Sequence, residues 1–496
     1  MLYFMQLVYK TSLFALLIGL FLPLNNHAQT QAPCGTNLGV SPWLRDFQTR
    51  INSSSRTDEV LYLPLQVHVV GTDQGTGYMS KKAVFQAFCT LNEDFVQANI
   101  QFFLANEINY IDNSDYYEHE FDGGYDMMAQ NNFSNVINCY IVEDPAGNCG
   151  YFFPGVDGIA LSKGCTGPND HTWAHEVGHF LSLPHPFYGW EGQNHNYSLP
   201  APAQWDGWEV EKMDGSNCTT SGDGFCDTTP DYLNYRWNCN GNNTSSTVQT
   251  DPNGETFVSN GSLFMSYSNS FCKSTFSDDQ IAAMRANVEE VRSNLLTVPP
   301  APEDIEIAVQ EEINVITPAP GALAEGNPIT LTWEPVPGAT HYIVQVNPFN
   351  FFSIIFEEQV VEGTSIQVSD LQANRTHYWR FKPYNAYNTC SDFTSSASFE
   401  TGITTATQEL LPGESLQLFP NPSSTGQVTI SLKTTTSGQA NWQLIDSRGS
   451  MQQQGSFVTL AGTQDQVLDL TGLPAGLYFV HLQLDDRQSV RKLMVY

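Results

Sequence analysis

Residues 175–185 read HEVGHFLSLPH, and this stretch decides how the surrounding chain must fold. Positions i and i+4 of an α-helix share a face, so a helix here presents His175 and His179 side by side. Glu176 projects next to them, and a chain reversal directly after the helix would bring His185 to the same point. Histidines in this spacing beside a glutamate are typical of a zinc site with three protein ligands and one open position. The alternative is an ordinary helix with core or surface histidines, but the third histidine favours the metal site.

The length and the first residues of the chain indicate an exported protein with several domains. A chain of 496 residues is too long for one core, and about three domains are expected. Residues 1–28 contain Lys10 and then an apolar run from Leu13 to Leu24, which predicts a secretory signal peptide. That run is too short to span a membrane comfortably, and no later segment approaches about twenty uninterrupted apolar residues. We therefore expect no transmembrane segment in the mature chain.

The charge of the chain excludes some classes of partner, and its cysteine content indicates disulfides. The chain has 52 acidic and 20 basic residues, a net charge of −32. Such a field repels nucleic acid and anionic membrane surfaces, which excludes both as expected partners. The 10 cysteines of an exported chain point to disulfides. Eight of them lie between residues 89 and 272, and because eight cysteines allow about 105 pairings, the pairing stays open.

The segment 61–297 shows the pattern of an α+β domain. It follows a polar stretch over residues 29–60, which we interpret as a pro-segment. Strand patterns begin at Val60 and recur over 100–104, 136–142 and, as an edge strand, 158–162, with helical spacing over 81–99 and 280–296. Strands and helices in this order, with the helix of residues 175–181, predict a mixed sheet with an active-site helix.

The rest of the chain is patterned as two all-β sandwiches. Helical periodicity disappears after the proline-rich linker at 297–302. Short strand patterns then follow at sandwich spacing, over residues 329–333, 342–346, 365–368, 378–381 and 396–399. A second linker over 402–413 leads to another all-β unit that ends at Tyr496. We expect immunoglobulin-like sandwiches over residues 316–402 and 415–496.

Several motifs together resemble a known enzyme family. Residues 175–185 resemble the long metzincin signature H-E-x-x-H-x-x-G-x-x-H, and residues 263–268 (LFMSYS) lie where that clan has its Met-turn. The stretch 222–230 (GDGFCDTTP), with Cys34-Gly-Thr near the mature N-terminus, is similar to the pappalysin metallopeptidases. This resemblance covers about residues 61–296. It implies a secreted zinc endopeptidase, made as a zymogen, that hydrolyses protein or peptide substrates.

The resemblance assigns roles to individual residues. Zinc held by the three histidines would activate a water, and Glu176 would act as general base. Met265 would lie under the metal as apolar support. Tyr267 is either a donor to the developing oxyanion or a core tyrosine. Cys34 is either a zinc ligand that keeps the precursor latent or a partner in a disulfide.

A second metal is a further candidate. Asp223, Asp227 and Asp231 form an acidic cluster that would ligate calcium, which pappalysin relatives bind. The alternative is a set of turn carboxylates without metal.

Two positions depart from the family pattern. Ser182 replaces the glycine of the long signature, where φ > 0 costs other residues of order a kcal/mol. Ser266 follows Met265 where pappalysins commonly have aspartate. The competing interpretation is therefore a catalytically degenerate binding or adhesion protein at the cell surface, built on a metzincin scaffold.

The two C-terminal units have resemblances of their own. Residues 316–402 resemble a fibronectin type III module, with Trp333 as its core tryptophan and Trp379 and Phe381 alternating on a later strand. Residues 415–496 resemble the C-terminal sorting domain of type IX secretion substrates, through LFPNP at 418–422, LPAGLYFV at 473–480 and the terminal RKLMVY. The alternative is a carbohydrate-binding or adhesive sandwich. The sorting resemblance implies the secretion machinery as a partner and release or attachment at the cell surface.

Overall fold

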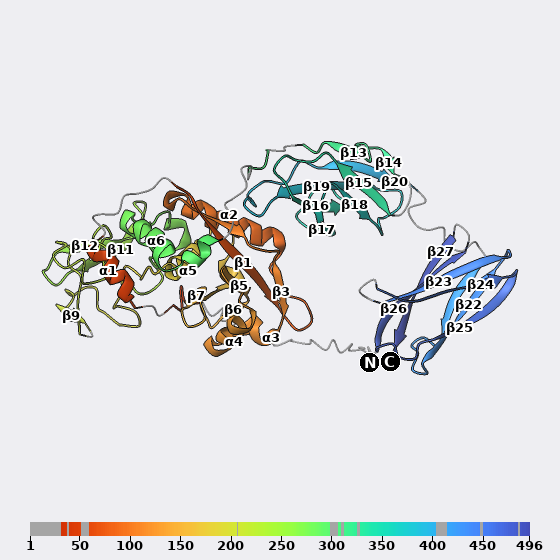
Figure 1. Cartoon of the computed structure of the whole chain (residues 1–496), viewed down its shortest axis with the longest axis horizontal. Coiled ribbons are helices and arrows are strands. Elements are labelled where there is room, and N and C mark those ends of the chain that lie inside the picture. Colours follow the sequence, from red (N-terminus) through yellow and green to blue (C-terminus); the bar gives the residue numbers. More distant parts are fainter. Residues whose placement is uncertain are drawn as a thin grey trace, which may run out of the picture.

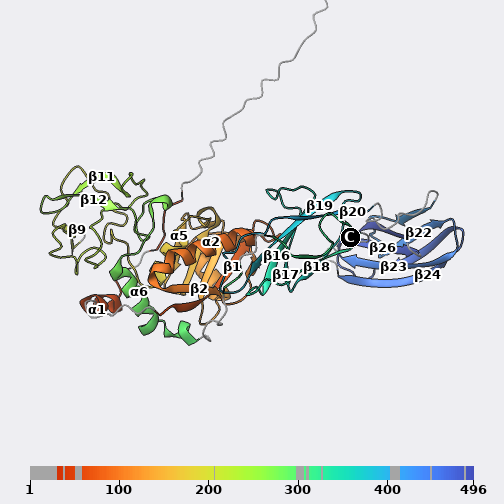
Figure 2. The ribbon, with the colours of Figure 1, turned by 90° about the horizontal axis from the view of Figure 1, so that it is seen from above.

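The computed structural model describes ten ranges of the chain: 31–36, 39–50, 59–205, 207–297, 306–308, 312–324, 328–402, 414–446, 450–484 and 487–496. The signal peptide expected over residues 1–28 lies outside the described residues. Figures 1 and 2 show a mixed α/β unit followed by two β-sandwiches along the chain. No helix in these ranges is long and apolar enough to cross a membrane.

A six-stranded mixed sheet forms the centre of the first unit, as the sequence predicts. Its path runs β2-β1-β5-β8-β7, and β3 pairs with β1 beyond the end of β2. All these pairs are parallel except β7 with β8. The strands are β1 Leu61–Gly71, β2 Ile100–Leu104, β3 Asn109–Asp112, β5 Ile137–Val142, β7 Gly150–Phe153 and β8 Gly158–Ser162, with a small pair β4 Glu118–His119 and β6 Asp144–Pro145 outside the sheet.

Both faces of the sheet are covered, which explains why β5 is buried along its whole length. Ile137 and Ile141 face the core that includes α2 and α5, whereas Tyr140 and Val142 face a second cluster with α4. The helices are α1 Pro42–Arg50, α2 Lys81–Phe95, α3 Ser114–Tyr117, α4 Phe121–Asn131, α5 Thr172–Phe180 and α6 Asp278–Glu290. The described part of this unit also contains short 3₁₀ helices, which are η2 Val96–Ala98, η3 Lys163–Cys165, η4 Ser270–Cys272 and η5 Ser293–Thr297.

The structure differs from the expected elements at β8 and α6, and it adds the helix α1. β8 is not the edge strand, because β7 pairs outside it. The polar lead-in contains α1, which begins at Pro42, where the Ser41 hydroxyl accepts from Leu44 N at 3.0 Å. The closing helix α6 ends at Glu290 and not at residue 296.

Residues 181–277 form a loop-rich part around its own apolar cluster, which includes Trp190, Tyr232 and Phe257. It contains two hairpins, β9 Gln204–Trp205 with β10 Trp208–Glu209, and β11 Thr244–Thr250 with β12 Thr256–Asn260. Disulfides Cys218–Cys226 and Cys239–Cys272 hold this part, and Cys149–Cys165 lies at the sheet edge. Disulfides therefore replace regular structure as the local constraint.

The second unit is a two-sheet sandwich, as expected. Its sheets are β13-β15-β18 and β14-β20-β19-β16-β17. The expected core tryptophan Trp333 is fully buried and lies 5.8 Å from the ring of Trp379 and 5.3 Å from that of Phe381. The strands are β13 Val315–Thr317, β14 Leu323–Ala324, β15 Ile329–Trp333, β16 His341–Asn347, β17 Glu357–Glu362, β18 Ser365–Val368, β19 Thr376–Tyr384 and β20 Ala397–Thr401.

The first two units are joined into one body. Cys89 of α2 forms a disulfide with Cys390 of the sandwich, 301 residues later in the chain. Leu104 at the end of β2 donates its N–H to Ala386 O at 2.9 Å, and one apolar cluster includes residues of both units. The sandwich is therefore a fixed part of the molecule that covers the β2 edge of the sheet.

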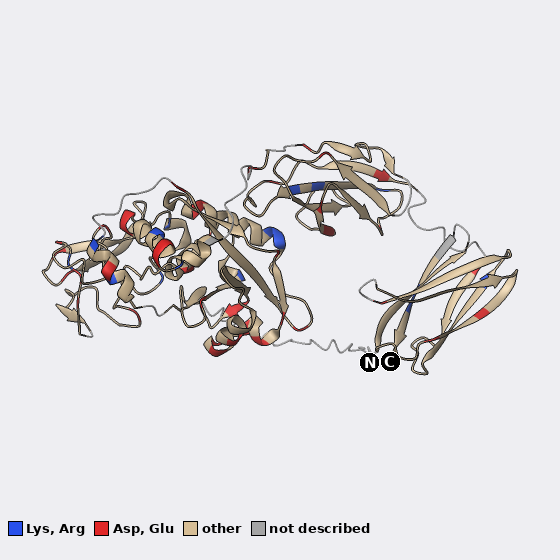
Figure 3. Cartoon of the chain, viewed as in Figure 1, with Lys and Arg blue, Asp and Glu red and all other residues tan. Residues whose placement is uncertain are grey.

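The third unit is a second sandwich with a separate core. Its sheets are β21-β22-β25 and β24-β23-β26-β27. The strands are β21 Ser415–Phe419, β22 Gln427–Thr434, β23 Gly438–Asp446, β24 Met451–Thr459, β25 Gly462–Asp469, β26 Gly476–Leu484 and β27 Arg487–Val495. Figure 3 shows acidic residues on all three units, as the net charge requires.

Candidate metal centre

The structure brings the three histidines together at the end of α5. His175 and His179 lie one turn apart on this helix, which ends at Phe180. Ser182 then adopts φ of 77°, and Leu183 N donates to Gly178 O at 2.9 Å, so the chain reverses. This reversal places His185 opposite the helix, as the sequence predicts.

The spacing of the ring nitrogens fits a tetrahedral zinc site. The Nε2 atoms of His175, His179 and His185 lie 3.1 to 3.3 Å from one another. Nitrogens bound tetrahedrally at the usual zinc distance of about 2.0–2.1 Å are about 3.3–3.4 Å apart. All three side chains are buried. The donor set and its geometry therefore fit a zinc ion.

The other ring nitrogens are held by acceptors. His175 Nδ1 donates to Phe264 O at 2.8 Å, His179 Nδ1 to Leu183 O at 2.7 Å, and His185 Nδ1 to Glu191 Oε1 at 3.1 Å. These bonds leave each Nε2 lone pair pointing into the cluster. Burial lowers the pKa of His175 and His179 well below the ordinary value, so both rings are neutral, as metal ligands must be.

Glu176 lies beside the histidines and is fully buried. Its Oε2 accepts from the Thr36 hydroxyl at 2.9 Å, whereas Oε1 has no hydrogen-bond partner. Burial raises the pKa of this carboxyl to about 7. A Cβ atom added at Gly150 would lie 2.9 Å from Glu176 Cγ, so the edge strand runs directly against the carboxylate. Glu176 is thus placed to exchange a proton with a group in the cluster.

Cys34 completes the group as a free, buried thiol. Its Sγ lies 3.6 Å from His179 Nε2, and the four candidate ligand atoms all lie within 4.8 Å of one another. Backbone bonds hold the segment 31–36 along β7: Ala32 N donates to Gly147 O at 2.9 Å, and Gly35 N to Gly150 O at 2.9 Å. The disulfide alternative for Cys34 is not realised in this structure.

Met265 and Tyr267 lie where the sequence places them, around the cluster. Met265 is fully buried, and a Cβ atom at Gly178 of α5 would overlap its sulfur. The Tyr267 hydroxyl donates to Cys34 O at 3.3 Å, and its ring lies 4.9 Å from that of His185. The hydroxyl of Tyr267 is therefore aimed at a carbonyl oxygen in the site. The neighbouring Ser266 accepts from Ser268 N at 3.0 Å.

The three aspartates of the acidic cluster differ in their burial and in their hydrogen-bond partners. Asp223 and Asp231 are buried, and each has one oxygen without a partner. Asp227 instead accepts from Ser277 Oγ and Asp279 N, both at 2.8 Å, at the start of α6. Within the described ranges, Cys34 and the three histidines are the only group of three or more such ligand atoms this close.

A third buried carboxyl, Glu211, was missed by the sequence analysis. Burial, followed by the charges of Asp223 and Asp231, raises its pKa well above the ordinary value. Burial likewise raises the pKa of Asp223, and that of Asp231 to about 7. Glu211 precedes Asp223 by twelve residues with no recognisable spacing, so the sequence offered no signal for it.

Thr36 and Glu191 were also missed. Thr36 is far from Glu176 in sequence, and nothing in the pattern links them. Glu191 follows His185 by six residues, and a search for an acceptor near the third histidine would have found it.

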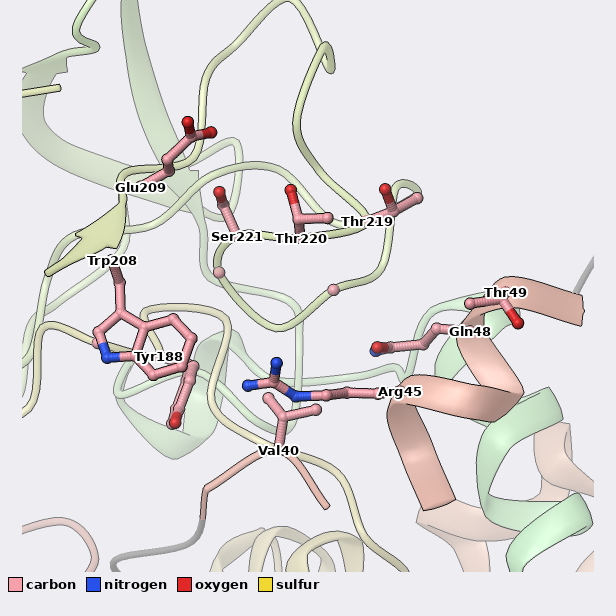
Figure 4. Close-up of a pocket in the computed structure, with 13 residues that line it drawn as sticks. Val40, Arg45, Gln48, Thr49, Tyr188, Trp208, Glu209, Thr219, Thr220 and Ser221 are labelled. Carbon is pink, nitrogen blue, oxygen red and sulfur yellow. The ribbon is translucent and has the colours of Figure 1, made fainter. Parts of the chain in front are cut away.

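A separate cavity of about 240 Å³ lies between α1 and the loops that carry Trp208 and Ser221. Figure 4 shows Arg45 and Gln48 projecting from α1 toward this space. Gln48 Nε2 also donates to Asp223 O at 2.8 Å. His175, His179 and His185 do not line this cavity, and the bond of Gln48 connects α1 to the acidic loop.

Comparisons with known proteins identify the third unit. Residues 417–496 match the family described as "Secretion system C-terminal sorting domain", which confirms the sorting resemblance. The domain indicates a protein that is secreted or attached to the cell surface, and it implies the secretion machinery as a partner. No curated protein matches the chain.

Two solved structures show weak similarity. One comprises the FN1-FN3 domains of chicken CNTN1, at 13% identity and a TM-score of 0.14, over 38% of this chain and 69% of that chain. The other is dimeric latent PorU from Porphyromonas gingivalis, at 14% identity and a TM-score of 0.15, over 40% of this chain and 21% of that chain. TM-scores this low carry no argument about function.

Proposed function

We propose that the protein is a secreted zinc endopeptidase of the metzincin clan, similar to the pappalysins and made as a latent precursor. The observation that carries the proposal is the triangle of Nε2 atoms, 3.1 to 3.3 Å apart, beside the buried Glu176. A structural zinc site would be closed by four protein ligands that stay in place, whereas here the fourth candidate comes from the pro-segment.

Each residue around the cluster has its own role in peptide hydrolysis. Bound zinc would polarise the scissile carbonyl and lower the pKa of a water toward about 7. Glu176 Oε1, which has no partner, takes the proton of the attacking water and passes it to the leaving amine. The Tyr267 hydroxyl donates to the oxyanion, and its present bond to Cys34 O supports this role.

Latency follows from the position of the segment 31–36. A sulfur at about 2.3 Å and a nitrogen at about 2.0–2.1 Å on one tetrahedral zinc are about 3.5–3.6 Å apart. The separation of Cys34 Sγ and His179 Nε2 is 3.6 Å. Thr36 at the same time occupies Oε2 of Glu176. The segment thus occupies the open metal position and one of the two carboxylate oxygens of the general base.

The competing interpretation, a degenerate binding or adhesion protein, rested on Ser182 in place of glycine. Ser182 adopts the left-handed φ of 77° all the same, and the histidines converge. The substitution therefore gives no reason to expect a damaged metal site. Calcium remains a proposal for Asp223 and Asp231, while Asp227 is engaged at α6.

The test is hydrolysis of a quenched casein substrate by the full chain after cleavage between residues 50 and 61. We expect zinc to copurify, a chelator to abolish activity, and Glu176→Gln to keep zinc but lose activity by about 10³-fold or more. The matched control is Glu118→Gln, at an exposed position, which should retain full activity. Zinc binding with equal activity in both variants contradicts the mechanism, and zinc without any hydrolysis supports the binding-protein alternative.

A further inference from the structure

Two basic residues of this strongly acidic chain, Arg236 and Lys273, lie on segments that contact the residues of the candidate metal cluster. Lys273 directly follows η4, and Arg236 directly precedes Trp237, whose N–H donates to Tyr267 O at 3.2 Å. The disulfide Cys239–Cys272 ties the two segments together. One local constraint therefore fixes both cations relative to Tyr267.

Arg236 lies on the side where the pro-segment meets the sheet edge. Its Nη2 is 3.2 Å from Cys149 Sγ, and Cys149 N donates to Ala32 O at 2.7 Å. Lys273 lies on a segment beside His175: the carbonyl oxygen of Thr275, two residues later, accepts from Phe264 N at 2.8 Å, and Phe264 O accepts from His175 Nδ1 at 2.8 Å. Burial lowers the pKa of Lys273 to about 8, and the charges of Asp170, Cys34 and Glu176 act in the opposite direction.

Neither cation has an acidic partner. Within the described residues, no carboxylate lies within 4.0 Å of the Lys273 ammonium or the Arg236 guanidinium. Asp170 is the acid with the largest influence on Lys273, but its Oδ1 already accepts from Thr172 N and Oγ1 at 2.9 and 2.7 Å. On the histidine side, Glu191 is held by His185 and Gly189 N.

The covering segment does not neutralise them either. Residues 31–45 contain no aspartate or glutamate, and the first acid after Cys34 is Asp46. Lys273 is partly buried, whereas Arg236 is exposed. A partly buried charge without a partner is unfavourable, and such exceptions concentrate where a ligand supplies the missing group. The precursor therefore leaves both positive charges free for the substrate.

We propose that Lys273, assisted by Arg236, selects substrates with an aspartate or glutamate next to the scissile bond. The proposal rests on the endopeptidase function proposed above. A carboxylate bonded to a partly desolvated ammonium is a charge-assisted pair, which corresponds to about 10- to 100-fold in kcat/KM over an uncharged side chain. The net charge of −32 alone would favour basic peptides. The net charge and Lys273 therefore predict opposite substrate preferences.

The test uses the full chain, activated by cleavage between residues 50 and 61, and two matched series of quenched peptides. One series has Glu, Gln or Lys before the scissile bond and the other has them after it. In one of the series we expect the wild-type kcat/KM to be about tenfold or more higher for Glu than for Gln, and lowest for Lys. Lys273→Gln should bring the Glu to Gln ratio close to one, and Lys273→Glu should make Lys the preferred residue.

Controls separate charge recognition from damage to the fold. Lys273→Arg keeps the charge and should keep the preference, and Lys212→Gln, elsewhere in the same loop-rich part, should leave it unchanged. Lys212→Gln should also cleave the Gln peptides at the wild-type rate, and all variants should copurify with zinc. Arg236→Gln, at an exposed position, should reduce the preference by a smaller factor.

A second readout needs no catalysis. The Glu176→Gln protein should bind the labelled Glu peptide at least tenfold more tightly than the Gln peptide in fluorescence anisotropy, and adding Lys273→Gln should remove the difference. A wild-type preference for Lys peptides, or a Glu preference that survives both Lys273→Gln and Arg236→Gln, overturns the proposal. Failure to cleave any peptide would instead overturn the endopeptidase function.

Discussion

Ser182 occupies the position where the chain leaves α5, with φ of 77°. A residue with a Cβ atom is strained there by about 1–2 kcal/mol. Its hydroxyl accepts from Asn287 Nδ2 at 2.8 Å, which ties the turn to α6. The strain of the left-handed conformation and the hydrogen bond therefore act in opposite directions at one residue.

Substitutions at Ser182 separate these two effects. We expect Ser182→Gly to change the free energy of unfolding by less than about 1 kcal/mol, because relief of strain offsets the lost bond. Ser182→Ala keeps the strain and loses the bond, so it should destabilise by about 1–2 kcal/mol. Chemical denaturation of the zinc-loaded protein measures both, and the cleavage pattern should stay the same. A loss of zinc affinity in Ser182→Gly would show that the side chain supports the site.

Asp231 makes stability depend on pH. Its carboxyl pKa is raised from 3.8 to about 7 by burial, so the folded state keeps a proton that the unfolded state loses. The stabilisation is complete below pH 3.8 and is lost as pH rises through about 7, by at most about 4 kcal/mol. Asp231→Asn removes this titration. In calcium-free buffer its melting temperature should therefore rise relative to wild type between pH 4 and 7.

Calcium gives the control for that comparison. If Asp223 and Asp231 bind the ion, added calcium should raise the melting temperature of the wild type at pH 8 and not that of Asp231→Asn. Equal responses of the two proteins would contradict a calcium site at these carboxylates.

The metal centre could be predicted at residue level because its chemistry is local in sequence. The residues 175–185 contain all three histidines and Glu176, and one helix and one turn bring them together. Thr36 and Glu211 could not be predicted, because each meets its partner through a tertiary contact that no spacing records. The buried Asp223 and Asp231 were singled out in the sequence, but the hydrogen bonds of Asp227 to the start of α6 could not be predicted, since proximity in sequence does not fix which way a turn residue faces.

At the level of elements, the segment 31–36 combines a thiol at the histidines with a hydroxyl on Glu176. We expect Cys34→Ala in the uncleaved precursor to release part of the latent activity, because the open metal position becomes accessible to water. Thr36→Val should release less, since the backbone bonds to β7 keep the segment in place.

Hydrolysis of a short quenched peptide, with the chain shown intact on a denaturing gel, measures this activation. Cys139→Ala is the matched control, because Cys139 is the other free buried cysteine among the described residues. Unchanged latency of Cys34→Ala would show that the backbone of the segment, and not its sulfur, blocks the site.

Long elements with clear periodicity were predictable, and short ones were not. β1 and α2 begin within one residue of the predicted positions, because a buried strand and an amphipathic helix leave strong patterns. β7 has only four residues without alternation, and so the edge of the sheet was assigned to β8. α1 carries a Ser-Pro start that indicates a helix, but its polar surroundings masked it.

At the scale of the whole molecule, the first two units share a core and the disulfide Cys89–Cys390. The third unit has a separate core. We expect calorimetry to show two transitions, one for residues 59–402 and one for the C-terminal sandwich. Replacing Cys89 and Cys390 by alanine should lower the midpoint temperature of the first transition by several degrees, because the loss of a long-loop disulfide costs about 2–5 kcal/mol. The midpoint temperature of the second transition should stay unchanged.

Three separate transitions in the wild type would contradict the shared core.

Linker composition allowed the number of units to be predicted from the sequence. Their fusion was not predictable, because Cys390 lies far from the other cysteines in the chain and only the folded topology brings it to α2.

The two edges of the central sheet differ in what covers them. The sandwich covers the β2 edge through the bond of Leu104 to Ala386, whereas among the described residues the segment 31–36 is what pairs along the β7 edge. If the chain is the latent peptidase proposed above, removal of residues 31–36 would expose a row of backbone donors and acceptors beside the histidines. A polypeptide that fills this row must be stretched out, as in strand addition. Unfolded or flexible regions of a target protein would thus be cut before any helix or intact domain.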